Sequence, residues 1–190
     1  MEKTVRIIFA SSAYAKDSKV VIGKDGDMPW KIEGKSMVPS DMVRFKNLTK
    51  GQSLVVGRKT WDSIPENFRP FDKNLPLEES RQSIIVTRNQ DFKVDNPRVM
   101  IAHSLEDAIQ LARTENVWII GGAEIYALTM PMADFLHQTL VYRKFDGDVF
   151  FPCYNRDKWR SVEPFKYFHA GCPGTENDQL DTAYLVLRRK

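Results

Sequence analysis

Cysteine, histidine and long apolar segments are scarce in this chain of 190 residues. Only two cysteines occur, Cys153 and Cys172, without a CxxC spacing, and there are three histidines. We therefore expect neither a disulfide framework nor a metal site. The N-terminus is charged, and no apolar stretch resembles a signal peptide or a transmembrane helix. These absences favour a soluble protein of the cytoplasm.

A large excess of charge of one sign is also missing. The chain has 28 basic and 25 acidic residues, which gives a net charge of +3. Such a mild excess favours anionic ligands but is too small for a nucleic-acid-binding surface. With 42% hydrophobic residues, a chain of this length can bury one substantial core. We expect a single domain over residues 1–190 and a monomer.

Short apolar runs alternate with helical patterns up to Pro131. Several runs are continuously apolar, as in Ile84-Ile85-Val86 and Val117-Trp118-Ile119-Ile120, which is typical of parallel strands covered by helices on both faces. The predicted strands are residues 6–10, 53–57, 83–87, 98–102 and 117–121, and the predicted helices are residues 40–49, 104–113 and 123–132. Ser104 is the expected N-cap of the second helix, because an acid follows three positions later.

Longer strands follow Pro131, predicted at residues 136–145, 159–168 and 182–189. The loop at residues 171–178 leaves no room for a crossover helix, so the last strand should form an antiparallel hairpin with the strand before it. The sequence thus predicts an α/β fold: a central, mostly parallel sheet flanked by helices, with an antiparallel C-terminal hairpin.

An apolar loop precedes the first predicted helix. Gly23, Gly26 and Pro29 are turn residues, and Asp25-Gly26 is a turn dipeptide, yet Ile22, Met28 and Trp30 are large and apolar. A loop with this much apolar surface normally covers something. The composition is typical of a lid that excludes water from a reaction.

One acid in the helix after this loop stands on an apolar face. If the helix begins at Ser40, then Asp41, Phe45 and Leu48 lie on the same side. A carboxylate there needs a donor partner or has a raised pKa, and both outcomes suit a ligand site. The alternative is that Asp41 merely complements the helix dipole in the first turn, with Ser40 as N-cap.

Two kinds of phosphate-binding pattern follow predicted strands. Gly121-Gly122 opens a helix directly after a buried strand, so its backbone N–H groups can approach an anion, although a tight turn without a ligand has the same pattern. It lacks the GxGxxG spacing of a classical dinucleotide site.

Basic residues form the second pattern, in Gly57-Arg58-Lys59-Thr60 and Thr87-Arg88. Ordinary solvated turns are the alternative reading. Parallel strands end at the same sheet edge, so two basic strand ends suggest a cofactor with an extra phosphate.

The chain resembles the dihydrofolate reductase family, whose sequence blocks occur here in order over almost the whole length. The matching blocks are Val21-Ile22-Gly23 with Met28-Pro29-Trp30, Pro39-x-Asp41-x-x-x-Phe45, residues 57–65, Ile120-Gly121-Gly122-Ala123-Glu124-Ile125-Tyr126, Thr139 and residues 147–152. Each block alone is weak, but together they are a specific signature.

The resemblance implies that NADPH is the cofactor, with Gly121-Gly122 as a cis peptide beside it and Tyr126 against the nicotinamide. Arg58, Lys59, Thr60, Thr87 and Arg88 match the contacts to the adenosine phosphate. The other positions implied in cofactor binding are Ala10, Ile22, Gly23, Gly57, Ser63, Gly121, Gly122, Ala123, Glu124, Ile125 and Tyr126.

The resemblance also implies that Asp41 binds the pterin ring of the substrate and that Thr139 supports it. The other positions implied in substrate binding are Met42, Phe45, Ile64, Ile120 and Tyr126, and those implied in catalysis beside Asp41 are Trp30 and Met28. An arginine should receive the glutamate tail in a bidentate pair. Arg81 is our choice, because it precedes a strand as the family's residue does, and Arg69 is the alternative. The inserted residues 71–80, with Ser80 in place of the expected glycine, depart from the family pattern here.

These residues together predict an NADPH-dependent oxidoreductase that converts 7,8-dihydrofolate to tetrahydrofolate in one-carbon metabolism and binds antifolate inhibitors. Proton delivery would run through a water molecule held by Trp30. The alternatives are a riboflavin-pathway pyrimidine reductase of the same fold, which predicts no inward acid and no Met-Pro-Trp lid, and a non-catalytic nucleotide-binding or RNA-binding module. The second alternative would need a basic stripe with exposed aromatic residues.

Overall fold

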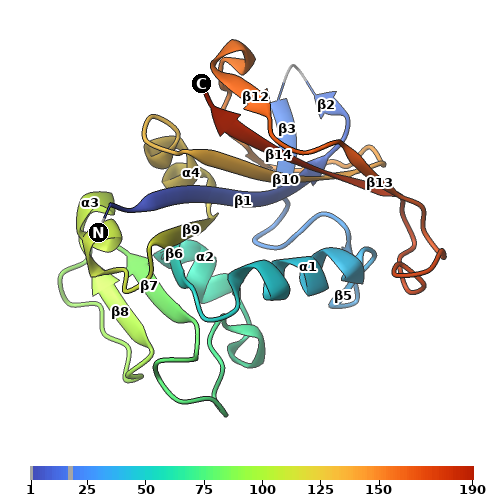
Figure 1. Cartoon of the computed structure of the whole chain (residues 1–190). Coiled ribbons are helices and arrows are strands. Elements are labelled where there is room, and N and C mark those ends of the chain that lie inside the picture. The colour runs from blue at the N-terminus through green and yellow to red at the C-terminus, as the bar shows by residue number, and fades with distance from the viewer. Residues whose placement is uncertain (1, 17–18) are drawn as a thin grey trace. The chain divides into compact units, whose positions relative to one another are not determined.

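Strands and short helices alternate along most of the chain in the computed structural model, which describes residues 2–16 and 19–190 (Figure 1). The described chain divides into two units. The first contains residues 2–7 and 48–134, and the second contains residues 8–47 and 135–190. No helix within the described ranges is long and apolar enough to cross a membrane.

A parallel sheet forms the centre of the first unit, with the order β1-β9-β6-β7-β8 (Figure 1). Each neighbouring pair is parallel, as predicted. The strands are β1 (Thr4–Ser12), of which residues 4–7 belong to this unit, β6 (Ser53–Gly57), β7 (Gln82–Val86), β8 (Val99–Ala102) and β9 (Asn116–Gly121). Strands β6, β7 and β9 are buried in successive residues, which confirms that both faces of the sheet are covered at these strands, whereas burial alternates along β1.

Three helices pack on these strands. They are α2 (Arg58–Ser63), against β6 and β7, α3 (Leu105–Leu111), against β7 and β8, and α4 (Ala123–Thr129), against β9 and β6. Ser104 caps α3 as predicted, because its Oγ accepts a hydrogen bond from the Asp107 amide at 3.0 Å. Both α3 and α4 end earlier than predicted. Ala112 is already extended after α3, and Pro131 has no amide to continue α4.

A long connection follows α2 in the same unit. It contains the short 3-10 helix η1 (Glu66–Phe68) and leads to β7. Phe71 in this connection is buried and belongs to a core cluster with Val56, Trp61 and Ile85. The connection is therefore anchored in the core of the first unit.

The second unit is antiparallel at its C-terminal strands. There β14 (Thr182–Arg189) pairs with β10 (Phe135–Val141) on one side, and with β12 (Trp159–Ser161) and β13 (Lys166–Phe168) on the other. The predicted hairpin is confirmed, but the single strand over residues 159–168 is wrong. It is interrupted at residues 162–165, where Pro164 has no amide for a ladder hydrogen bond.

The predicted strand over residues 136–145 is also too long at its C-terminal end. Val141 in β10 faces Thr182, the first residue of β14, so the residues after Val141 have no partner in that strand. Pairing with β14 therefore ends β10 four residues before the predicted limit.

The remaining elements of the second unit are short, apart from one helix. They are β2 (Ala15–Lys16), β3 (Lys19–Gly23), β4 (Lys31–Ile32), β5 (Lys35–Ser36), β11 (Val149–Phe150), η2 (Arg156–Lys158) and α1 (Pro39–Thr49), whose last two residues belong to the first unit. The predicted lid at residues 21–30 thus begins as a strand. It continues through a turn in which Lys24 and Asp27 exchange two backbone hydrogen bonds of 2.9 Å.

The turn confirms the prediction for Asp25-Gly26, because both residues adopt positive φ angles, of 50° and 82°. After the turn, Trp30 is buried in a cluster with Met37, Val38 and Val141. The apolar residues of this loop therefore contribute to a core of the second unit.

Candidate active site

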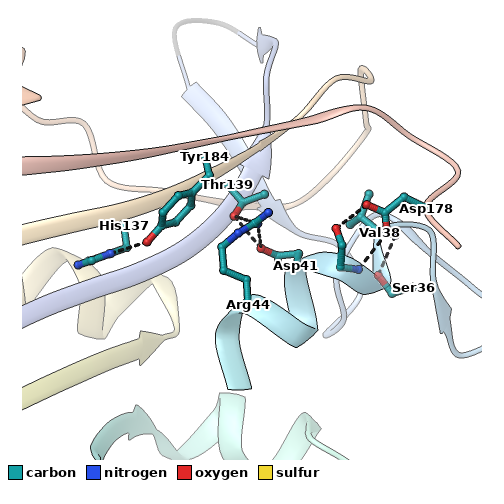
Figure 2. Close-up of polar contacts among 9 residues, drawn as sticks. Ser36, Val38, Asp41, Arg44, His137, Thr139, Asp178 and Tyr184 are labelled. Carbon is teal, nitrogen blue, oxygen red and sulfur yellow. Dashed lines mark hydrogen bonds and ion pairs between the residues drawn. The ribbon is translucent and has the colours of Figure 1, made fainter. Parts of the chain in front are cut away.

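Asp41 lies in the first turn of α1, and its side chain is 16% exposed. The hydroxyl of Thr139, on β10, donates a hydrogen bond of 2.6 Å to Asp41 Oδ1. Arg44 follows one helical turn later, with its Nη1 3.4 Å from the same carboxylate oxygen and 3.3 Å from Thr139 Oγ1 (Figure 2). The structure thus brings the predicted pair Asp41 and Thr139 together and adds a cation to it.

The N-terminus of α1 is capped from a distant segment. The Ser40 amide donates to Asp178 Oδ1 at 2.9 Å, and the Ser40 hydroxyl donates to Asp178 Oδ2 at 2.5 Å. The alternative expectation of Ser40 as N-cap is therefore wrong. Pro39 is already helical, as is common at the first helical position, and Asp178 supplies the acceptor instead. This contact fixes the turn that carries Asp41.

Arg44 is held between two aromatic rings. Its Cζ lies 4.7 Å from the centre of the Phe168 ring and 4.9 Å from that of Tyr184. Tyr184 is buried, and its Oη lies 2.6 Å from His137 Nδ1 (Figure 2). Because cation–π contacts and a buried neighbour restrict the guanidinium, its charge has a defined place beside Asp41.

The pKa of Asp41 is raised above its ordinary value of 3.8 because burial penalises the charged carboxylate. The hydrogen bond from Thr139 and the charge of Arg44 lower this pKa and offset part of the effect, whereas the nearby charge of Asp178 raises it. The two outcomes predicted for an inward acid therefore occur together. Asp41 has donor partners and a raised pKa.

The other positions predicted to bind the substrate are distributed over the two units. Met42 and Phe45 are half-buried on α1, in the second unit. In the first unit, Ile64 follows α2, Ile120 is half-buried at the end of β9, and Tyr126 is buried on α4.

The predicted lid residues lie around Trp30. Its side chain is 1% exposed, and its Nε1 is buried without a hydrogen-bond partner among the described residues. Met28 is half-buried against the same cluster, as is Ala10 of β1. Ile22 and Gly23 form the end of β3. A buried N–H group without a partner is rare in proteins, so this Nε1 is a donor that the described part of the protein leaves unused.

Glycine allows helices α2 and α4 to approach strand ends closely in the first unit. A Cβ atom at Gly122 would lie 2.6 Å from Thr60 Oγ1, and one at Gly57 would lie 2.9 Å from Ile125 Cγ1. The peptide bond between Gly121 and Gly122 is cis, which confirms that expectation. The ends of β6 and β9 therefore pack more closely against Ile125 and Thr60 than any side chain at these two positions would allow.

The basic residues lie at the predicted sheet edge. Gly57 pairs with Val86 in the parallel ladder, so Arg58 and Thr87 both follow that pair. Lys59 is exposed.

The two arginines of this edge form exposed ion pairs. Arg58 contacts Asp62 at 2.6 Å, and Arg88 contacts Glu124 of α4 at 2.9 Å. Exposed pairs of this kind contribute little stability, so a phosphate can replace either carboxylate.

Among the remaining predicted cofactor positions, Ser63 donates a hydrogen bond to the Thr60 carbonyl at 2.8 Å. Ala123 and Ile125 lie in the first turn of α4. Both segments flank the close approach at Gly57 and Gly122.

The two candidate arginines for the glutamate tail differ in their surroundings. Arg81 makes a two-pronged ion pair with Asp72, at 2.8 and 3.1 Å. Arg69 stacks over the Trp61 ring, with its Cζ 4.9 Å from the ring centre, and its Nε has no hydrogen-bond partner within the described part of the chain. Our first choice is thus the arginine that already binds a carboxylate of the protein.

Sequence reasoning missed three residues of the Asp41 network. Arg44 had a signal, because it stands three positions after Asp41 on a helix, where opposite charges meet. Asp178 and Tyr184 had none, since each reaches the network from a segment more than 130 residues away.

Comparisons with known proteins agree with one another. A family model described as dihydrofolate reductase matches residues 9–187. The dihydrofolate reductase of Staphylococcus haemolyticus is 39% identical over 149 residues, which cover 78% of this chain and 79% of the relative. That of Bacillus subtilis strain 168 is 35% identical over 183 residues, or 95% and 94% of the two chains.

A solved structure is similar over nearly the same span. It is the dihydrofolate reductase from Enterococcus faecalis complexed with NADP(H) and RAB-propyl, with a TM-score of 0.75 and 26% sequence identity. The similarity covers 98% of this chain and 96% of the other.

Proposed function

The chain belongs to the dihydrofolate reductase family, and from this premise we propose how its residues reduce 7,8-dihydrofolate to 5,6,7,8-tetrahydrofolate with NADPH. The family match favours this reaction over the pyrimidine reductase and the non-catalytic module. One observation carries the proposal. The carboxylate of Asp41 is largely buried and accepts a hydrogen bond of 2.6 Å from Thr139.

Asp41 binds the pterin ring in this proposal. Its carboxylate accepts paired hydrogen bonds from a ring N–H and the exocyclic amine of the substrate, while the Thr139 hydroxyl fixes the orientation of the acid. A negative charge in a site with little water favours the protonated form of the substrate, which is the form that accepts hydride. Met42 and Phe45 on the same helix provide apolar surface for the ring.

Trp30 positions the water molecule that delivers the proton. Its buried Nε1 has no hydrogen-bond partner among the described residues, so it is free to hold a water molecule that delivers the proton to the substrate nitrogen. Met28 and the rest of the apolar loop exclude bulk water from this step.

The first unit fits the proposed cofactor. Arg58, Lys59 and Arg88 provide exposed cations for phosphate at the strand ends beside Gly57 and Val86. When bound, NADPH supplies the hydride. Arg58, Lys59, Thr60, Thr87 and Arg88 would hold its adenosine phosphate, and Tyr126 would lie against its nicotinamide.

The test is the loss of reduced-nicotinamide absorbance when the enzyme is mixed with NADPH and 7,8-dihydrofolate. We expect oxidation only when both ligands are present, and slower oxidation with NADH. Arg88→Gln should raise KM for NADPH but not for NADH, whereas Arg160→Gln, a change of another exposed arginine, should raise neither. An enzyme that oxidises no NADPH under these conditions would refute the proposal.

We further propose that the chain acts as one functional domain and as a monomer of 21.9 kDa in the cytoplasm. Light scattering of the eluting protein tests the oligomeric state. A mass of about twice this value would refute the monomer.

A further inference from the structure

The guanidinium of Arg81 already binds a carboxylate of the protein itself. Its Nη2 donates to Asp72 Oδ1 at 2.8 Å, and its Nε donates to Asp72 Oδ2 at 3.1 Å. This two-pronged geometry is the one with which an arginine binds a free carboxylate. The Arg81 side chain is only 10% exposed, so little of the guanidinium remains for a second anion.

Asp72 is held in place on both sides. Its amide donates to the hydroxyl of Ser80 at 3.0 Å, and that hydroxyl also contacts the Arg81 carbonyl at 3.1 Å. Ser80 itself is fully buried. On the other side, Phe71 packs into the core cluster that contains Trp61. Ser80, the residue that departs from the family pattern, therefore positions the acid that pairs with Arg81.

Two further arginines tie down the segment between Asp72 and Ser80. Arg98 donates to the Leu75 carbonyl at 2.7 Å, and Arg113 donates to the Leu77 carbonyl. These contacts come from outside the segment. They make the ion pair part of an ordered connection of the first unit.

We propose that Asp72 occupies the place of the substrate's tail carboxylate on Arg81, so that the enzyme recognises folates mainly through the pterin ring. The inference rests on the proposed function and adds a substrate preference to it. Folates with a glutamate tail should have only a small advantage over dihydropterins that lack the tail.

An internal acid competes well with a ligand carboxylate because it is tethered at a high effective concentration. Asp72 is also charged across the neutral range, since the hydrogen bond to Arg81 holds its pKa below the ordinary value. A substrate carboxylate would have to displace a charged, correctly placed acid.

The test compares kcat/KM for 7,8-dihydrofolate with that for 6-methyl-7,8-dihydropterin, which has no glutamate tail. Asp72→Asn keeps the side-chain volume and removes the competing charge. We expect it to raise the ratio of the two values about tenfold or more, through a lower KM for dihydrofolate, which corresponds to about 1.4 kcal/mol. Turnover of the dihydropterin should stay unchanged and reports that the fold is intact.

Two further variants isolate the cause. Glu78→Gln removes an exposed charge from the same segment and should leave the ratio unchanged. Adding Arg81→Gln to Asp72→Asn should abolish the gain, because the released guanidinium is then gone. Arg81→Gln alone should change the ratio less than about twofold, because Asp72 already occupies the guanidinium in the unaltered enzyme. The effects of the two substitutions are therefore not additive.

An unchanged ratio in Asp72→Asn, with normal dihydropterin turnover, would overturn the inference. So would a tenfold fall in the ratio for Arg81→Gln alone, because Arg81 would then already bind the tail. Failure of the proposed function is distinct from both results, because neither substrate would then be reduced by the unaltered enzyme.

Discussion

Water solvates an ionised carboxylate better than a protein interior does, and at Asp41 two neighbours replace only part of that solvation. Thr139 donates one hydrogen bond and Arg44 adds a positive charge at 3.4 Å, yet the pKa remains raised. The unsatisfied remainder suits a group that exchanges hydrogen bonds with a ligand. At the scale of the residue, the neighbours of Asp41 replace only part of the solvation that its carboxylate has in water.

Arg44→Met tests the role of the cation. Methionine keeps the apolar contact with Phe168 and Tyr184 but removes the charge, so the pKa of Asp41 should rise further. Loss of the cation–π contacts should lower the free energy of unfolding by about 1–2 kcal/mol. Carbon-detected NMR titration of the Asp41 carboxyl group gives the pKa, and chemical denaturation gives the stability.

Arg44→Lys is the matched control, because it keeps a positive charge without the planar group. The pKa of Asp41 should rise less in this variant than in Arg44→Met. Equal titration of Asp41 in all three proteins would show that the charge of Arg44 does not act on the acid.

Asp41 and Thr139 could be predicted as partners because both lie in sequence blocks that resemble a known family. Arg81 shows the limit of that reasoning. Its position before β7 suggested a ligand-binding arginine, but its partner Asp72 lies in inserted residues, and a pair across an insertion leaves no periodic signal.

At the scale of the element, the start of α1 depends on a residue far along the chain. Asp178→Ala removes both hydrogen bonds to Ser40. We expect a loss of about 1–2 kcal/mol of unfolding free energy, as for other N-terminal helix caps. Because the loosened turn carries Asp41, KM for dihydrofolate should also rise.

Thermal melting and steady-state kinetics measure these two effects. Asn177→Ala, a change at the neighbouring exposed residue, serves as the control and should affect neither. If Asp178→Ala kept both the melting temperature and KM, the cap would have no part in placing Asp41.

The close approach of α2 to the end of β9 allows a second test. Gly122→Ala would place a Cβ atom 2.6 Å from Thr60 Oγ1, so we expect a loss of about 1–3 kcal/mol of unfolding free energy. Thr60→Ala removes that oxygen and should restore part of the loss in the double variant. Chemical denaturation of the four proteins gives the coupling, and strictly additive losses would contradict the packing described.

Strands with continuous apolar runs could be predicted closely, and β6 and β14 have the predicted limits. Elements whose limits depend on a partner could not. Strand β10 stops where β14 begins, and the lid residues start inside β3 because that strand pairs with β11. Local pattern contains no information about where a distant strand starts.

At the scale of the whole molecule, the parallel pairing in the first unit and the antiparallel C-terminal strands could both be predicted. The first followed from unalternating apolar runs and the second from a connection too short for a crossover helix. The pairing of β14 with β10 could not be predicted by such reasoning, because these two strands are separated by 40 residues of polar loops and short strands.

Stability of the whole molecule should depend on pH through Asp41. Its folded pKa is raised, so the folded state holds the proton more tightly than the unfolded state does. The stability from this group is complete below the ordinary value of 3.8 and declines as pH rises through the raised pKa. Asp41→Asn resembles the neutral acid and should therefore unfold at a higher temperature than the unaltered enzyme at pH 7.

Melting curves across the acid and neutral range measure this difference, which should shrink as pH falls toward 3.8. A variant less stable than the parent at pH 7 would show that the partners of Asp41 outweigh its desolvation.

The most direct test of the central claim is the pH dependence of kcat for Asp41→Asn with saturating NADPH and dihydrofolate. If Asp41 favours protonation of the substrate, turnover of the variant at pH 7 should fall about 100-fold or more, and it should recover as acid in solution supplies the proton. Full turnover at pH 7, with normal binding of folate, would contradict the account.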